Sequence, residues 1–207
     1  MIKGVIFDLD GTLVDTVEVW ADIWERAFKE EGLNVGRDEI KRFVGLPLDG
    51  IIKSLGIHSE ELERRIADKK KDLVKLYADR ARLFPDVMPV LEYLRDKNIK
   101  VCVASSSLDD WIEYMLKKFR LEKFVDSYVS GYDVKRPKPE PDVFIEAFRR
   151  IGIDPKDGMV VGDRESDVIP AIKIGAKAAL IDRLGETKDP KEYAVIKNLE
   201  ELKKMIR

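Results

Sequence analysis

The stretch Val5-Ile6-Phe7-Asp8-Leu9-Asp10-Gly11-Thr12 decides the fold and points to the chemistry. Its first three residues are apolar and β-prone, as in a parallel strand buried on both faces. Gly11 then permits an immediate turn, so Asp8 and Asp10 lie at the carboxyl end of the strand. That end of an open α/β sheet is where ligands bind. Because two neighbouring acids resist ionising together unless a cation joins them, the stretch predicts either a solvated acidic turn or a metal-dependent site.

The rest of the chain divides into two patterns. From Phe84 onward, short apolar strands alternate with amphipathic helices, which predicts a parallel, doubly wound α/β sheet. Between residues 16 and 83, apolar residues repeat every three or four positions without a convincing strand, which predicts an all-helical insert. We therefore expect an α/β core formed by residues 1–15 and 84–207 and a helical domain at 16–83. Asp86 is expected to cap the first helix after the insert.

The composition excludes several classes of protein. The 38 basic and 40 acidic residues leave a formal charge of −2, without the basic excess of a nucleic-acid binder. No apolar run is long enough to cross a membrane, and Met1 runs directly into a strand rather than a signal peptide. The single cysteine, Cys102, fits a reducing cytoplasm. The charged fraction of 38% points to a thermophilic source.

Polar side chains follow four of the predicted strands, and the ends of parallel strands meet at one edge of a sheet. Phosphoryl transfer needs an in-line nucleophile, a proton donor for the leaving oxygen, and positive groups around the equatorial oxygens. The side chains expected at this edge supply all three kinds of group. They are Asp8, Asp10, Ser105, Lys138, Asp163 and Asp167.

A resemblance to a known family covers the same residues. Asp8-Leu-Asp-Gly-Thr-Leu-Val-Asp-Thr16 resembles the first motif of the haloacid dehalogenase (HAD) superfamily in its phosphatase branch. Ser105, Lys138-Pro-Glu-Pro-Asp142 and Gly162-Asp-Arg-Glu-Ser-Asp167 match the later motifs in the family's order. The resemblance implies a Rossmann-like core with a helical cap, similar to phosphoglycolate phosphatase and β-phosphoglucomutase-like proteins.

The resemblance also implies a role for each acid in the first motif. Asp8 is expected to attack phosphorus and form an aspartyl phosphate. Asp10 is expected to protonate the leaving oxygen and then to deprotonate the attacking water. Ser105, with the backbone N–H of Ser106, is expected to bind the phosphate, and Lys138 to neutralise it.

The family pattern implies Mg²⁺ as the cofactor, because the clustered ligands are hard oxygens. Asp8, Asp163 and the backbone carbonyl of Asp10 are expected to bind the ion. Asp167 either contacts it through water or only meets a helix dipole.

In the helical insert, Gly45-Leu46-Pro47-Leu48 is expected to be a cap loop that dips toward the substrate and selects the leaving group. Mutase-type relatives carry an arginine near this loop, and Leu48 occupies the comparable place, which speaks against a mutase. An alternative is that Leu46 and Leu48 simply pack inside the insert.

The function expected from the sequence is a Mg²⁺-dependent phosphatase of a small phosphorylated metabolite, either a phosphoglycolate-like compound or a sugar phosphate. Three alternatives remain open: a β-phosphoglucomutase-like hexose phosphate mutase, a haloacid dehalogenase, and an inactive binding module. Asp10 speaks against the dehalogenase, because that branch has no second acid at this position. We expect a monomer or weak homodimer in the cytoplasm, with no nucleic-acid or membrane partner.

Overall fold

The structure, a computed structural model, describes residues 1–44, 48–183, 185, 187 and 192–206. The chain divides into two compact units. The α/β unit comprises Met1–Val14 and Leu83–Arg207, and the helical unit comprises Asp15–Arg82. Among the described residues, no helix is long and apolar enough to cross a membrane.

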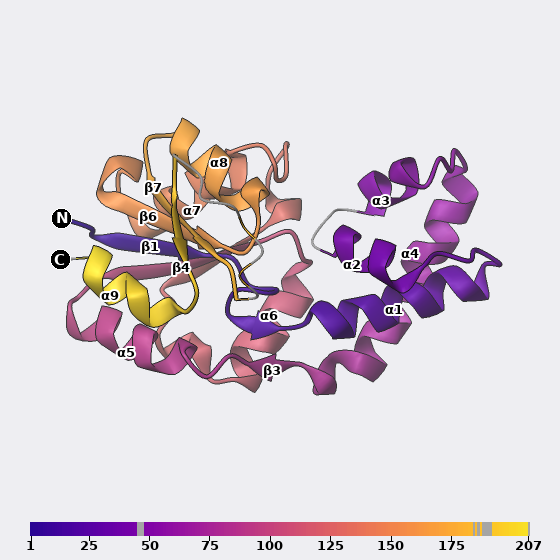
Figure 1. The fold of residues 1–207 in the computed structure, drawn as a ribbon, viewed down its shortest axis with the longest axis horizontal. Coiled ribbons are helices and arrows are strands. Elements are labelled where there is room, and N and C mark those ends of the chain that lie inside the picture. Colours follow the sequence, from indigo (N-terminus) through magenta and orange to yellow (C-terminus); the bar gives the residue numbers. More distant parts are fainter. Residues whose placement is uncertain (45–47, 184, 186, 188–191, 207) are drawn as a thin grey trace. The chain divides into compact units, whose positions relative to one another are not determined.

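A six-stranded sheet with parallel pairing forms the centre of the α/β unit (Figure 1). Its strand order is β5-β4-β1-β6-β7-β8, so β1, which carries the apolar residues Val5, Ile6 and Phe7, has a neighbour on each side. None of these three side chains is exposed, as expected for a strand buried on both faces. The strands are β1 (Gly4–Phe7), β4 (Lys100–Ser105), β5 (Ser127–Ser130), β6 (Gly158–Gly162), β7 (Lys177–Ile181) and β8 (Ala194–Ile196).

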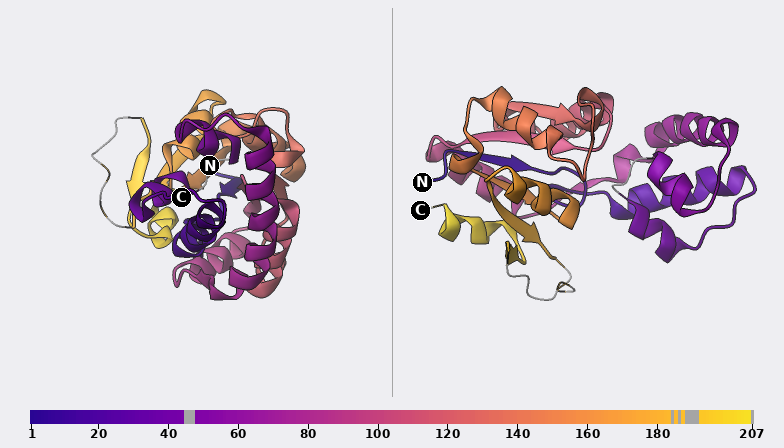
Figure 2. Two further views of the ribbon diagram at one scale, coloured as in Figure 1. Left: turned by 90° about the vertical axis from the view of Figure 1, so that its right-hand side faces the viewer. Right: turned by 90° about the horizontal axis from the view of Figure 1, so that it is seen from above.

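Helices cover both faces of this sheet. On one face, Phe144 and Phe148 of α7 (Asp142–Ile151) pack in one buried cluster with Ile6 of β1, together with residues of α8 (Glu165–Lys173). On the other face lie α5 (Val87–Asp96), α6 (Asp109–Lys118) and α9 (Leu202–Met205) (Figure 1). The predicted doubly wound α/β fold is therefore confirmed. The chain termini lie near one another at one end of this unit (Figure 2).

In the described part of the helical unit, four α-helices make up most of the chain (Figure 2). Trp20 and Trp24 of the first helix are buried, and the Lys70 ammonium lies 5.8 and 5.3 Å from the centroids of their rings. Of the predicted cap loop, Gly45, Leu46 and Pro47 lie outside the described residues, while Leu48 begins a helix and is half-buried. The role of that loop therefore stays a prediction. The helices are α1 (Val17–Glu30), α2 (Arg37–Phe43), α3 (Leu48–Ser54) and α4 (Glu60–Tyr77).

The segments that connect the two units pair as a short two-stranded sheet. Its strands are β2 (Val14–Asp15) and β3 (Arg82–Leu83). The sequence predicts no strand at Arg82, and this was wrong because two residues are too few to show an alternating pattern. The remaining short elements are 3₁₀ turns at Ala78–Arg80, Leu121–Lys123, Gly131–Asp133, Pro155–Asp157 and Leu199–Glu201.

Candidate active site

A buried lysine joins two aspartates at the carboxyl end of the sheet. Asp8 directly follows β1, and its backbone N–H donates to the carbonyl of Val161 in β6 over 2.9 Å. The Lys138 ammonium lies 2.6 Å from Asp8 Oδ1 and 2.8 Å from Asp167 Oδ1. It also donates to the carbonyl of Ala104 over 2.8 Å. Because an ammonium has three protons, each proton has an acceptor and the Lys138 side chain is held from three directions.

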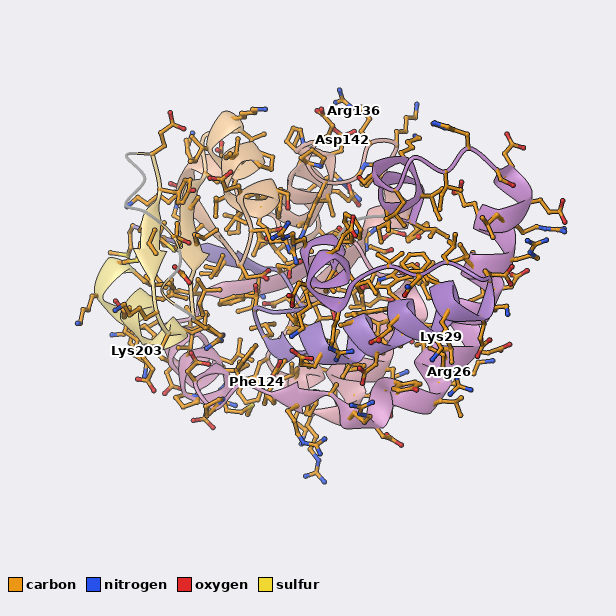
Figure 3. All side chains as sticks on the ribbon, turned by 45° about the vertical axis from the view of Figure 1, so that its right-hand side comes forward. Arg26, Lys29, Phe124, Arg136, Asp142 and Lys203 are labelled. Carbon is orange, nitrogen blue, oxygen red and sulfur yellow. The ribbon has the colours of Figure 1, made fainter. Side chains whose placement is uncertain are left out.

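The loop that carries Lys138 is closed by a surface ion pair. Arg136 donates from Nε and Nη2 to the two carboxylate oxygens of Asp142, over 3.1 and 2.7 Å (Figure 3). Behind the ammonium, the ring centroid of Phe144 lies 5.2 Å from Nζ. Arg136 thereby ties the start of this loop to the first residue of α7.

Three carboxylates cluster around this lysine. Asp8, Asp163 and Asp167 each offer an oxygen, and these three atoms lie within 4.8 Å of one another. Two glycines make room for them. A Cβ on Gly11, which has φ +90°, would lie 2.5 Å from Asp163 Oδ2, and a Cβ on Gly162 would lie 2.3 Å from Asp167 Oδ2.

The cluster resists carrying three negative charges at once. Burial raises the pKa of Asp8 well above its usual value, and Asp167 and Asp163 raise it further, against the opposing effect of Lys138. Burial and the charge of Asp167 raise the pKa of Asp163 to about 6. For Lys138, burial lowers the pKa, but Asp167 and Asp8 outweigh this and raise it overall. One ammonium therefore does not fully compensate the three acids.

A hard divalent cation fits these donors. Mg²⁺ prefers carboxylate and carbonyl oxygens and keeps several waters, and a bound cation would favour the ionised form of Asp8 and Asp163. Sites for softer metals need histidine or cysteine ligands. The one cysteine, Cys102, is fully buried in β4, and the one histidine, His58, belongs to the helical unit.

The carboxylate of Asp10 is held by two side chains from the segment after β4. Ser107 Oγ donates to Asp10 Oδ2 over 2.8 Å. The indole N–H of Trp111 points at both oxygens, 3.0 Å from Oδ1 and 3.2 Å from Oδ2. The role of Trp111, a residue of α6, was not predicted from the sequence. Trp111 lies in the first turn of a helix that follows a polar strand end. This position was the one sequence feature that could have indicated a contact with the site.

The turn after β1 is anchored by Arg183, whose role was also not predicted from the sequence. Arg183 donates to the carbonyl of Thr12 over 2.9 Å and to both oxygens of Asp86 over 2.9 and 3.1 Å. Its guanidinium lies 3.6 Å from the ring centroid of Phe84. The backbone N–H of Leu199 also donates to Asp86, over 2.8 Å. The prediction that the Asp86 side chain caps α5 was wrong, because these partners engage its carboxylate and it makes no capping hydrogen bond.

The family model of the haloacid dehalogenase-like hydrolases matches residues 5–181. The chain belongs to this family. The predicted family and the predicted class of enzyme, a hydrolase of this family, are thereby confirmed.

Two curated relatives of this hydrolase match over most of their length. The phosphorylated carbohydrates phosphatase of Thermotoga maritima is 28% identical over 211 residues, covering 99% of this chain and 90% of that protein. The pyrophosphatase PpaX of Oceanobacillus iheyensis is 28% identical over 180 residues, covering 87% and 83%. Among solved structures, a hydrolase from Pseudomonas syringae aligns with a TM-score of 0.85 at 27% identity, over 99% of this chain and all of that one.

Most of the side chains predicted for the site of this hydrolase lie at the same edge of its sheet. Direct contacts link Asp8, Lys138 and Asp167, and Asp163 joins them in the acidic cluster. Ser105 ends β4, and its Oγ accepts from the backbone N–H of Ser107 over 3.1 Å, so it shapes the turn that carries the partner of Asp10. The phosphate-binding roles of Ser105 and Ser106 stay predictions.

Proposed function

We propose that this hydrolase is a Mg²⁺-dependent phosphatase of small phosphorylated metabolites that works through an aspartyl phosphate on Asp8. The observation that carries the proposal is the Lys138 ammonium set between Asp8 and Asp167 at the strand ends, beside Asp163. The arrangement supplies a fixed carboxylate nucleophile and a positive group at its side. Phosphoryl transfer needs this combination and little other covalent chemistry from the protein.

In the first step, a carboxylate oxygen of Asp8 attacks phosphorus while the bond from phosphorus to the leaving oxygen breaks. Asp10 gives a proton to that oxygen, so the product leaves as an alcohol. Lys138 orients Asp8 through their 2.6 Å contact and offsets negative charge beside the transferring group. Ser105 and the backbone N–H of Ser106 bind the phosphate oxygens in this proposal.

In the second step, Asp10 takes a proton from a water molecule as that water attacks the phosphorus of the aspartyl phosphate. The bond from phosphorus to Asp8 breaks, and inorganic phosphate and free Asp8 result. Asp8, Asp163 and the backbone carbonyl of Asp10 would hold Mg²⁺, which supplies positive charge that keeps Asp8 ionised. Asp167 would act through water, because its oxygens are already engaged by Lys138 and by the backbone N–H of Arg164 at 3.2 Å.

Phosphorylated carbohydrates are the first substrate class to test, because the relative named for them matches 99% of this chain. Pyrophosphate is the second, because a relative that matches 87% of the chain is named a pyrophosphatase. A panel of sugar phosphates, phosphoglycolate and pyrophosphate, assayed with Mg²⁺ for phosphate release, separates these classes. Adding a bisphosphorylated sugar to a hexose phosphate tests for a mutase, which would return an isomer instead of phosphate.

The nucleophile is tested by Asp8→Asn. The amide keeps the shape of the side chain but removes the attacking carboxylate, so we expect turnover to fall by at least about a thousandfold with an unchanged circular dichroism spectrum. Asp15→Asn, the same change at an exposed residue of the connecting segment, is the control and should retain activity. Near-normal hydrolysis by Asp8→Asn would refute the aspartyl-phosphate mechanism.

A further inference from the structure

The indole of Trp111 makes an unusual contact for a residue on the apolar face of a helix. Only 4% of its surface is exposed, and it lies in the first turn of α6 beside Ile112 and Met115, which are fully buried. Yet its one polar atom, Nε1, points at the Asp10 carboxylate at 3.0 and 3.2 Å. The side chain therefore serves two purposes: its rings pack in the core and its N–H reaches the edge of the sheet.

The two donors that hold Asp10 differ in what they can do. An indole N–H only donates, so Trp111 always needs an acceptor lone pair on the carboxyl group. A serine hydroxyl donates or accepts, so Ser107 can stay bonded to Asp10 whether the carboxyl carries a proton or not. Trp111, fixed by core packing, sets the orientation of the carboxyl group, and Ser107 adapts to its protonation.

We propose that Trp111 is a positioning residue for Asp10, acting through its indole N–H to hold the carboxyl group in the orientation from which it serves the leaving oxygen. The proposal rests on the proposed function, in which Asp10 is the general acid. Loss of the N–H would remove one of the contacts that fix the carboxyl group of Asp10 and so widen the range of its orientations. Poor orientation of a catalytic group lowers the rate at the step where that group transfers its proton.

Two substitutions at Trp111 separate the N–H from the packing. Trp111→Phe keeps an aromatic ring in the core and removes the donor. Trp111→His keeps a ring N–H that can occupy nearly the same position as Nε1 and loses the bulk of the second ring. The comparison is made at pH 9 with saturating Mg²⁺, because a neighbouring carboxylate raises the pKa of a histidine and only the neutral ring matches the indole as a donor. Ser107→Ala removes the other contact without touching the helix.

The readout is kcat/KM on two aryl phosphates of similar size. Nitrophenolate leaves readily without a proton, whereas the phenolate of phenyl phosphate depends more on the general acid. For Trp111→Phe we expect a loss of about tenfold on phenyl phosphate and less than about twofold on p-nitrophenyl phosphate. Trp111→His should keep the wild-type ratio of the two substrates, even where its melting temperature is lower. Ser107→Ala should lose about threefold on phenyl phosphate.

Two results would overturn the inference and leave Trp111 a packing residue. One is an equal loss of kcat/KM on both substrates in Trp111→Phe. The other is a ratio of the two kcat/KM values that changes in Trp111→His but not in Trp111→Phe. If Trp111→Phe does not fold, Trp111→His decides: the wild-type ratio of the two substrates supports the inference and an altered ratio overturns it. Failure of the proposed function looks different, because the wild-type protein would then release no phosphate from either compound.

Discussion

Lys138 shows how one residue organises a charged site inside a folded protein. Its side chain is 6% exposed and lies between two carboxylates that are themselves almost fully buried. Removing one partner from such a set leaves uncompensated charge in the interior, which costs far more than the loss of a surface pair. The sequence could indicate Lys138 through its place among prolines, but not its third acceptor, the carbonyl of Ala104, which depends on how the loop docks against β4.

We therefore expect Lys138→Met to lower the free energy of unfolding of the metal-free protein by about 3 kcal/mol, as judged by urea denaturation. The loss should be smaller with Mg²⁺ present, because the cation then compensates Asp8. Lys135→Met, at an exposed position three residues earlier, should change stability by less than about 0.5 kcal/mol. Equal denaturation midpoints for Lys138→Met and wild type would show that the buried pairs contribute no net stability.

At the scale of elements, the close approach of β6 to the start of α8 depends on a missing side chain. Gly162 ends β6, and Asp167 in the first turn of α8 occupies the space where a Cβ would stand. Asp167 can reach Lys138 and the backbone N–H of Arg164 only because that space is empty. The strand, the turn and the helix are thus fitted to one another through the acidic cluster.

Gly162→Ala should displace Asp167 and with it the contact to Lys138. We expect a loss of activity of about tenfold or more and a destabilisation of about 1–3 kcal/mol, measured by phosphate release and by denaturation. Gly36→Ala is the matched control, because a Cβ there meets nothing within 4 Å and the backbone has an ordinary φ of −66°. Wild-type activity and stability in Gly162→Ala would mean that α8 moves to make room for the methyl group without any cost in free energy.

Local patterns were enough to predict a doubly wound α/β sheet and the strand ends that carry Asp8, Ser105 and Asp163, because periodicity and turn residues occur within a few neighbouring positions. The short edge strand β8 was not predicted. The contact of Trp111 with Asp10 joins residues 101 positions apart, and that of Arg183 with Asp86 joins residues 97 apart. Such contacts depend on how whole helices and loops are oriented relative to one another. A short stretch of sequence does not determine that orientation.

At the scale of the whole molecule, metal binding and folding are linked. The ligands proposed for Mg²⁺ follow the ends of β1 and β6, so the ion would join parts of the α/β unit that are distant in sequence. A cation that binds the folded state alone stabilises it by RT ln(1 + [Mg²⁺]/Kd). The predicted Mg²⁺ site can therefore be tested by its effect on protein stability, independently of turnover.

We expect Mg²⁺ at one hundred times its Kd to add about 2.7 kcal/mol, which raises the melting temperature by roughly 5–10 °C over the protein in EDTA. Hydrolysis should stop in EDTA and return with Mg²⁺. Asp163→Ala should weaken both responses more than Asp167→Ala, because Asp167 is proposed to act through water. Full activity after rigorous metal removal, or a melting temperature unaffected by Mg²⁺, would contradict the site.

The three tryptophans are divided between the two units, and this gives the protein its own optical reporters. Trp20 and Trp24 belong to the helical unit, whereas Trp111 is the one indole of the α/β unit. In a protein carrying Trp20→Phe and Trp24→Phe, all indole emission would arise beside Asp10. The wavelength and intensity of that emission would then follow the surroundings of the Asp10 carboxyl group as substrate or Mg²⁺ binds.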